Sequence, residues 1–216
     1  MATKLVSDIV TRASTILQDT TNVRWPTDEL VKWVNDAQLE IVKLVPDAYT
    51  KSESVQLVPG TKQSLPASGI RLIEVVRNMG GAGSTPGRAV RKVPRMVLDT
   101  QHPDWHSESD AVVKHYIFDT RDPKRFYVYP GQPSPANYVE LVYSAAPPAV
   151  AISDVISIDD VYANSILHCV LYFAYLKDAD YAANDQRAAN AWQVFLNTLQ
   201  GKTAADETIE PSGDGR

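Results

Sequence analysis

Residues Trp25 to Tyr49 read WPTDELVKWVNDAQLEIVKLVPDAY, and the architecture expected for the rest of the chain is built around them. Asp28 and Glu29 place negative charge beside backbone N–H groups that have no partner at the start of a helix, and Thr27 offers a capping hydroxyl. Pro46 ends the segment, because proline has no N–H to donate and disfavours helical geometry in the residue before it. Apolar side chains recur at spacings of four, three, four and three, at Leu30, Val34, Ala37, Ile41 and Leu44. The stretch therefore predicts one amphipathic helix whose role is packing.

Three other segments have the same period. At the N-terminus, apolar residues between Leu5 and Leu17 predict a helix that pairs with the one after Pro26 as a helical hairpin. The segment Ile158 to Leu176 is apolar on more than one side, which predicts the central helix of a bundle. A last helix is expected from about Tyr181 to Gln200, and Gly201 is well placed as its C-terminal cap.

Between residues 51 and 150 the apolar period shortens and turn residues become frequent. Strands are expected at Ser54–Leu57, Lys62–Leu65, Ile70–Val76, Val112–Phe118, Arg125–Tyr129 and Tyr138–Tyr143. The strand that ends at Phe118 and the strand that begins at Arg125 are expected to form a hairpin. The segment around Arg95 fits either a short helix or a strand. The region predicts a small antiparallel sheet, a sandwich or a partial barrel.

Helices at both ends with strands between them predict an α+β fold. Residues 1–50 and 153–201 are expected to form one discontinuous helical bundle, into which an antiparallel β-rich region, 51–150, is inserted. The segment 202–216 carries four acidic side chains against two basic ones and has almost no apolar content. It is therefore expected to be a flexible acidic C-terminal tail.

The composition argues against several classes of protein. A hydrophobic share of 44% and a charged share of 22% are ordinary for a globular protein, and a net charge of −5 argues against one that coats nucleic acid. No stretch has the roughly 18 apolar residues of a membrane helix, and the N-terminus lacks the apolar run of a secretory signal. Synthesis in the cytoplasm is expected. Cys169 is the one cysteine, so no internal disulfide is possible, and a buried, inert thiol is expected.

A histidine pair is the strongest hint of metal chemistry. His102 and His106 are four residues apart, with Asp104 and Glu108 nearby. Two histidines at this spacing bind a metal when they share a helix face. Pro103 disfavours helical geometry in the residue before it, and no third ligand is visible, so a surface loop without a metal is expected.

Other patterns do not predict catalysis or a cofactor. The glycine-rich loop Gly80–Gly87 lacks both phosphate-binding spacings, and no helical pattern follows it directly. No G-x-S-x-G turn positions a nucleophile. Asp159 and Asp160 are explained as favourable charges at the start of a helix. No catalytic, cofactor or metal residues are therefore assigned, and a small metal-dependent hydrolase remains an alternative that rests on His102 and His106 alone.

The distribution of charge is more informative. Between Val75 and Leu98 there are five bases and no acid, whereas the C-terminal tail is acidic. A nucleic-acid surface usually has aromatic residues among the bases, and this stretch has none. The alternative to a solvated loop is a head-to-tail contact between subunits of a closed ring. The residues assigned to this inter-subunit or partner contact are Arg88, Arg91, Lys92, Arg95, Asp206, Glu207 and Glu210.

Both helical ends carry motifs of an unusual kind. The pattern Trp-x-x-x-Glu-Leu from Trp25 is followed by Trp-x-Asn-Asp-Ala-Gln from Trp33. Further matching blocks are Ile16 to Asp19, Val45 to Ala48, Ala174 to Ala179 and Ala188 to Phe195. With these motifs the chain resembles the adaptor, or head-to-tail connector, proteins of short-tailed bacteriophages, which are related to the tubular tail protein of the upper tail ring. The likeness covers both helical ends and is loose in the β-rich region.

This resemblance implies a non-enzymatic structural protein of the virion neck that is synthesised in the host cytoplasm. It implies a homo-oligomeric ring of about twelve copies between the portal protein and the tail nozzle, with genomic DNA passing through its lumen without sequence-specific binding. The helices Thr27–Leu44 and Asp159–Gln200 would form the ring wall, and the segment after Gly201 would reach toward the portal. No cofactor and no membrane are implied. A tail-completion or baseplate protein is the alternative within the structural class.

Overall fold

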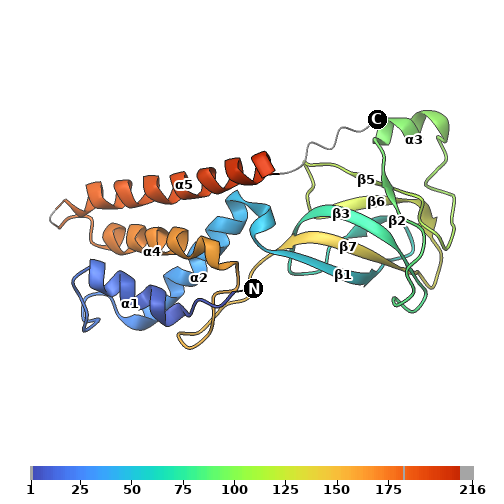
Figure 1. Ribbon diagram of the computed structural model, residues 1–216. Coiled ribbons are helices and arrows are strands. Elements are labelled where there is room, and N and C mark those ends of the chain that lie inside the picture. The colour runs from blue at the N-terminus through green and yellow to red at the C-terminus, as the bar shows by residue number, and fades with distance from the viewer. Residues whose placement is uncertain (1, 182, 210–216) are drawn as a thin grey trace. The chain divides into compact units, whose positions relative to one another are not determined.

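The computed structural model describes the backbone of residues 2–181 and 183–209, and the side chains of the same ranges as far as Gly201. Contacts between Cα atoms divide the chain into two compact units. One unit consists of Met1–Tyr49 with Pro147–Arg216, and the other is Thr50–Ala146. We refer to them as the helical unit and the β unit (Figure 1).

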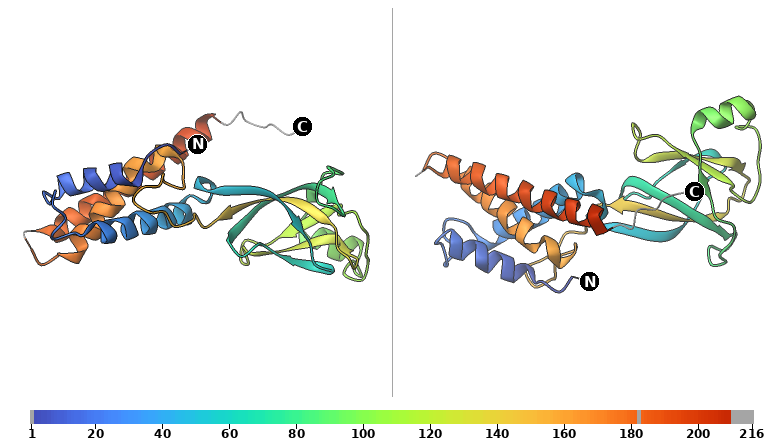
Figure 2. Two further views of the ribbon diagram at one scale, coloured as in Figure 1. Left: turned by 90° about the horizontal axis from the view of Figure 1, so that it is seen from below. Right: turned by 45° about the horizontal axis from the view of Figure 1, so that its top comes forward.

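The helical unit is formed by segments from both ends of the sequence, coloured blue and orange to red in Figures 1 and 2. Its elements are α1 (Val6–Ile16), α2 (Thr27–Leu44), η1 (Pro46–Ala48), η2 (Asp160–Tyr162), α4 (Ala163–Lys177) and α5 (Asn184–Ile209). The bounds of α2 are those that its apolar period and Pro46 predict. Helix α4 contacts α1, α2 and α5, which explains why apolar residues occur on several of its sides.

Cys169 lies on α4 and is completely buried. Burial raises the pKa of its thiol to about 12, and the carboxylates of Glu40 and Asp36 act in the same direction. The prediction of a buried and inert thiol is confirmed in its first part, and the raised pKa gives the physical reason for the second.

The expected end of the last helix is wrong. Helix α5 does not stop at Gly201 but continues through it to Ile209. Gly201 has no positive φ, so it is not the left-handed cap that the sequence suggested. A glycine inside a helix costs only about 1 kcal/mol, and the Ala204, Ala205 and Glu207 that follow favour a helix. Residues 202–209 are thus helical, whereas the rest of the expected flexible tail lies outside the described residues.

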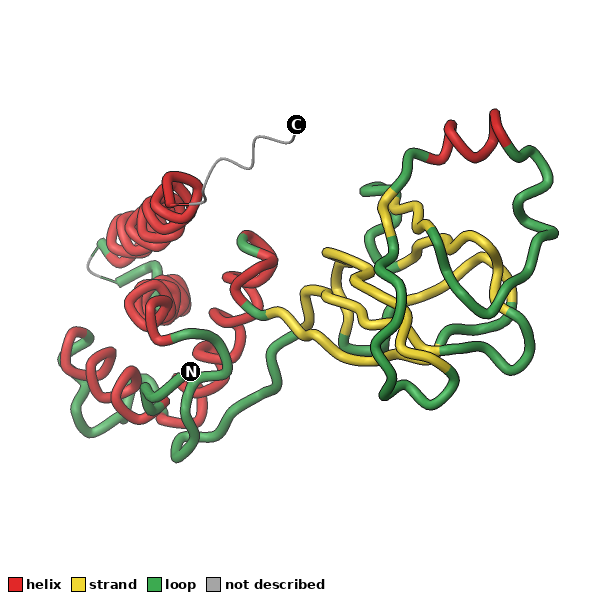
Figure 3. Tube along the Cα trace, turned by 45° about the vertical axis from the view of Figure 1, so that its right-hand side comes forward, coloured by secondary structure: helices red, strands yellow, loops and turns green. Residues whose placement is uncertain are grey.

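The strands of the β unit are β1 (Thr50–Gln56), β2 (Gly60–Ser64), β3 (Gly69–Gly80), β4 (Arg91–Lys92), β5 (His115–Phe118), β6 (Arg125–Gln132) and β7 (Tyr138–Ala145). Within the described residues they form a three-stranded sheet of order β1-β7-β3 and a four-stranded sheet of order β2-β6-β5-β4. Figure 3 shows the strands of this unit in yellow and the loops between them in green. Buried side chains alternate along β7, at Val139, Leu141 and Tyr143, so one face of this strand is turned to the core.

The predicted β5–β6 hairpin is confirmed, with Phe118 opposite Phe126. The expectation of a purely antiparallel region is wrong at β4, which pairs with β5 in parallel. The physical reason is the segment between them, which contains a short helix, α3 (Arg95–Gln101), and returns the chain to the same end of the sheet. Of the two alternatives around Arg95, the helix is therefore correct.

Candidate functional site: a basic groove in the β unit

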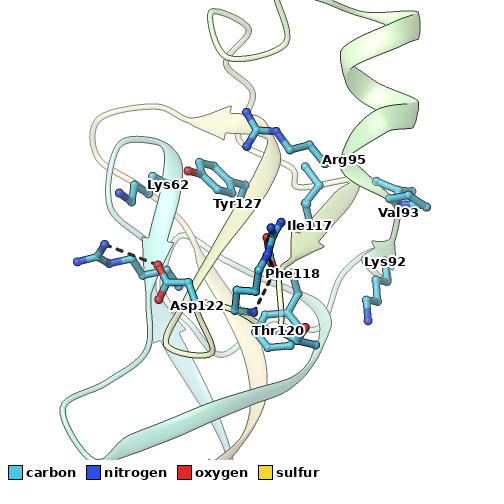
Figure 4. A pocket seen from close by; sticks show the side chains of 13 residues that line it. Lys62, Lys92, Val93, Arg95, Ile117, Phe118, Thr120, Asp122 and Tyr127 are labelled. Carbon is cyan, nitrogen blue, oxygen red and sulfur yellow. Dashed lines mark hydrogen bonds and ion pairs between the residues drawn. The ribbon is translucent and has the colours of Figure 1, made fainter.

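A groove with a volume of about 660 Å³ lies on the β unit, between α3 and the turn that joins β5 to β6. Figure 4 shows side chains from several elements around it. Five of the lining residues are cations and two are carboxylates, whereas the others are apolar or carry a hydroxyl. The lining residues are Lys62, Lys92, Val93, Pro94, Arg95, Ile117, Phe118, Asp119, Thr120, Arg121, Asp122, Arg125 and Tyr127.

Strand pairing produces the floor of the groove. Lys62 of β2 is opposite Tyr127 of β6, and Tyr127 is opposite Ile117 of β5. Paired residues of antiparallel strands point to the same face of a sheet, so these three side chains stand in one row. Ile117 is 5% exposed and belongs to a small apolar cluster with Leu98 and Trp105, against which Tyr127 packs.

The α3 segment forms one wall and holds a cation in place. Trp105 is 1% exposed, and its indole Nε1 donates to Asp99 Oδ1 at 2.9 Å. The other oxygen of Asp99 lies 3.3 Å from Arg95 Nε. The Arg95 guanidinium also lies 5.8 Å from the centre of the Tyr127 ring, which is within the range of a cation–π contact. A buried anchor therefore fixes the position of Arg95 at the rim.

The turn between β5 and β6 forms the opposite wall. Arg121 binds Asp119 with two nitrogens, at 3.1 Å from Nε to Oδ1 and 2.8 Å from Nη2 to Oδ2. This hydrogen bonding lowers the pKa of Asp119 to about 2. Arg125 Nη1 lies 3.6 Å from Asp122 Oδ2. Both carboxylates of the groove are therefore paired with an arginine of their own turn.

The two lysines are the cations most available to a ligand. Among the described residues, no ion pair involves Lys62 or Lys92. Lys92 Nζ lies 5.7 Å from the centre of the Phe118 ring. They belong to strands at opposite edges of the four-stranded sheet, and Figure 4 shows them on opposite sides of the groove. With three more cations than carboxylates in its lining, the groove is suited to a negatively charged ligand that also has an apolar part.

The structure divides the basic stretch that the sequence singled out. Lys92 and Arg95 line the groove, whereas Arg88 and Arg91 are exposed but are not part of the lining. Arg77 is engaged elsewhere, with its Nε 2.5 Å from Glu140 Oε2. Asp206 and Glu207 lie on α5 in a part whose side chains are not described, and Glu210 lies outside the described residues.

Sequence reasoning missed Lys62, Arg121 and Arg125. Arg121 and Arg125 flank the turn of the predicted hairpin, and this could have placed them near the end of β5. Lys62 gave no such signal, because its proximity to Tyr127 depends on the pairing of β2 with β6 across a long separation in sequence.

The histidine pair is not arranged around a common point. Trp105 lies between the two histidines in sequence, and its ring centre is 3.6 Å from that of His106. His106 Nδ1 is 2.8 Å from Thr61 Oγ1, whereas His102 stacks on Tyr129 with ring centres 6.0 Å apart. Among the described residues, no group of three or more His, Cys, Asp or Glu side chains could hold a metal ion.

The other sequence candidates have local explanations. In the glycine-rich loop, Gly83 has φ +74°, and a Cβ there would lie 2.8 Å from the Tyr138 ring. Asp159 accepts a hydrogen bond from Val161 N at the start of η2, as expected of a capping residue. Asp160 instead binds the N-terminal segment, accepting from Thr3 N at 2.9 Å and Lys4 N at 2.9 Å.

The motifs at the two helical ends contact each other in the helical unit. Trp25 Nε1 donates to the carbonyl oxygen of Ala174 at 3.1 Å. Arg24 pairs with Asp178, and Lys177 pairs with Glu29 at 2.5 Å. The Trp25 block and the Ala174 block are thus the two sides of one contact between the start of α2 and the end of α4.

The Asn-Asp-Ala-Gln motif of α2 binds the segment that follows the β unit in sequence, at Val150 and Ser157. Asn35 Nδ2 donates to Val150 O at 3.1 Å, and Val150 N donates to Asn35 Oδ1 at 2.8 Å. Gln38 is fully buried, and its Oε1 accepts from Ser157 N at 2.7 Å. Asn35 and Gln38 thus bind backbone groups of the segment that follows Pro147.

The SU10 adaptor protein family matches this chain over residues 5–212. The chain belongs to the SU10 adaptor protein family. It is a structural adaptor protein of bacteriophages, in agreement with the resemblance drawn from its helical ends. A comparison with curated protein sequences gave no match. Of the adaptor's helices in the described residues, none is both long and apolar enough to cross a membrane.

Proposed function

We propose that the adaptor forms a ring in the virion neck that joins the portal protein to the tail nozzle. The observation that carries this proposal is the family match over 5–212, which includes both the helical unit and the β unit. The motif residues support it because they stabilise the fold: Trp25, Asn35 and Gln38 all bind backbone groups within the helical unit. In this proposal the folded protein offers binding surfaces to the portal, to the nozzle and to other adaptor subunits. A ring of about twelve copies would repeat each surface.

Helix α5 and the segment after it are proposed to reach toward the portal. The helix already extends to Ile209, so the partner would meet a partly preformed element. A preformed element loses less conformational entropy on binding than a disordered one. Lys92 and Arg95 on one subunit, with Asp206, Glu207 and Glu210 on the next, are proposed to take part in the contact between subunits or with the portal. Arg88 and Arg91 lie outside the groove and are proposed to add only attraction at a distance.

Passage of DNA through the lumen is compatible with the charge of the chain. The net charge is −5, and a protein with a surplus of acids releases few counterions when it surrounds DNA. Weak attraction would let the duplex slide. No sequence-specific DNA binding is proposed.

Electron microscopy of the purified protein tests the proposal, alone and after mixing with the portal of the same phage. We expect adaptor density on the tail-facing end of the portal, with rings that close around an open lumen. The matched control is the variant Cys169→Ser, which alters a buried residue and leaves every surface unchanged. Portal particles without adaptor density, under conditions in which both proteins are folded, would rule out this function.

A further inference from the structure

We propose that the basic groove of the β unit binds the acidic C-terminal segment of a second copy of the adaptor, with Asp206, Glu207, Ile209 and Glu210 as the contacting residues. This inference rests on the proposed ring and names the partner of a site within it. It differs from the general contact proposed above because it assigns binding to the groove itself and excludes Arg88 and Arg91 from the site.

The composition of the groove sets the chemistry of its ligand. Lys62 and Lys92 have no carboxylate partner among the described residues, and Arg95 is held at the rim by Asp99 and Tyr127. The surfaces between these cations are apolar, since Ile117, Phe118 and Tyr127 contribute to the lining. A suitable ligand therefore has several carboxylates close to an apolar side chain.

The C-terminal segment has this pattern. Residues 206–210 read DETIE, which places Ile209 among three carboxylates. An isoleucine side chain can pack on the apolar floor while the acids on either side of it meet the cationic rim. A volume of about 660 Å³ is large enough for a few side chains and too small for a folded domain.

Two features favour a peptide over a nucleic acid. Two carboxylates, Asp119 and Asp122, belong to the lining, and they would repel a continuous row of phosphates. A peptide has its charges at separate positions and can leave these two carboxylates with Arg121 and Arg125. Tyr127 and Phe118 are also occupied in part by Arg95 and Lys92, which leaves less aromatic surface for stacked bases.

The test measures binding of a fluorescent peptide of residues 202–216, KTAADETIEPSGDGR, to the full-length protein. The protein carries Asp206→Asn, Glu207→Gln and Glu210→Gln, so that its own tail does not compete. In this background we expect saturable binding that weakens with added salt, and a loss of affinity of at least about tenfold with Lys62→Glu and Lys92→Glu together. Both lysines are exposed, and circular dichroism checks that the double variant is folded.

The matched control is Arg88→Glu with Arg91→Glu, which reverses the same number of charges in the same basic stretch but outside the groove. Its effect on affinity should stay below about threefold, since the charges act only at a distance. A peptide with the three acids replaced by their amides should not bind. Equal binding by the Lys62/Lys92 and Arg88/Arg91 variants would overturn the inference.

Two further outcomes separate this inference from the proposed function. If portal-bound rings form with the Lys62/Lys92 variant and the peptide does not bind the groove, the adaptor function stands and the groove assignment is wrong. If a DNA duplex binds the protein, depends on Lys62 and Lys92, and the peptide does not bind, the groove is a nucleic-acid site and the inference is also overturned.

Discussion

Asn35 shows how one polar side chain holds two distant parts of the sequence together. Its amide group both donates to Val150 O and accepts from Val150 N, and it also donates to Val31 O at 3.1 Å. The substitution Asn35→Ala removes the side-chain hydrogen bonds to both the N–H and the carbonyl oxygen of Val150. We expect a loss of about 1–3 kcal/mol in the free energy of unfolding, measured by urea denaturation, because two partly buried backbone groups lose their hydrogen bonds. Asp36→Ala is the control, since Asp36 is exposed, and a change within about 0.5 kcal/mol is expected.

His115 makes the stability of the β unit depend on pH. Burial lowers the pKa of His115, and the positive charges of Arg88, Arg91 and Lys114 act in the same direction. Its Nδ1 is buried without a hydrogen-bond partner in the described structure. The unfolded chain takes up a proton near the ordinary pKa of 6.5, and the folded chain does so only at lower pH. The contribution to stability is therefore complete above this value and is lost as the pH falls toward the folded pKa.

The variant His115→Phe tests this pH dependence. It keeps a ring that can stack on Tyr129 but cannot take up a proton. We expect the free energy of unfolding, followed by tryptophan fluorescence, to fall less steeply between about pH 7.5 and about pH 5 than in the wild type. His168→Phe is the comparison in the helical unit, because burial lowers the pKa of His168 as well. A flatter slope with His168→Phe alone would assign the pH dependence to the helical unit. Identical slopes for wild type and His115→Phe would contradict the assignment.

At the scale of elements, the helices were more predictable than the groove. The bounds of α2 follow from residues within the helix and beside it, namely the acids of its first turn and the proline after Val45. The groove depends on which strands pair, because Lys62, Tyr127 and Ile117 come from three strands. The parallel contact between β4 and β5 was also beyond sequence reasoning, since two residues are too few to show a period.

Gly201 is the position where the sequence predicts a helix end but the structure has a continuous helix. It lies inside α5, and a Cβ built there has no atom within 4 Å. We expect Gly201→Ala to stabilise the protein by about 0.5–1 kcal/mol, because alanine loses less backbone entropy in a helix. Thermal unfolding followed by circular dichroism at the helix band measures the effect. If Gly201 were instead a left-handed cap, the same change would destabilise the protein.

Gly60→Ala is the matched control for that experiment. A Cβ at Gly60 also has no atom within 4 Å, but its φ is +96°. Strain in this region of φ should destabilise the protein by about 1 kcal/mol or more. If Gly201→Ala stabilises the protein and Gly60→Ala destabilises it, backbone conformation and not available space decides the change in stability.

At the scale of the whole molecule, the sequence order explains why the family motifs lie at both ends. The chain leaves the helical unit after Tyr49 and returns to it at Pro147. The motif residues on α2 then bind the returning segment at Val150 and Ser157, and the start of α2 binds the end of α4. Contacts between residues that precede and residues that follow the inserted segment thus complete the helical unit. These contacts are made by specific polar and aromatic side chains.

The ends of the inserted unit lie close together, which makes the insertion separable. Strand β1 begins at Thr50, and Thr50 is paired with Ser144 of β7 in antiparallel register. Paired residues of antiparallel strands have Cα atoms about 4.5–5.5 Å apart, so a linker of about four Gly and Ser residues can replace Thr50–Ala146. We expect the shortened chain to unfold cooperatively in urea with a helical circular dichroism spectrum, and the isolated segment 50–146 to fold as a β protein. A shortened chain that is helical but unfolds without cooperativity would show that the helical unit needs the β unit in order to pack, and would contradict the division into two units.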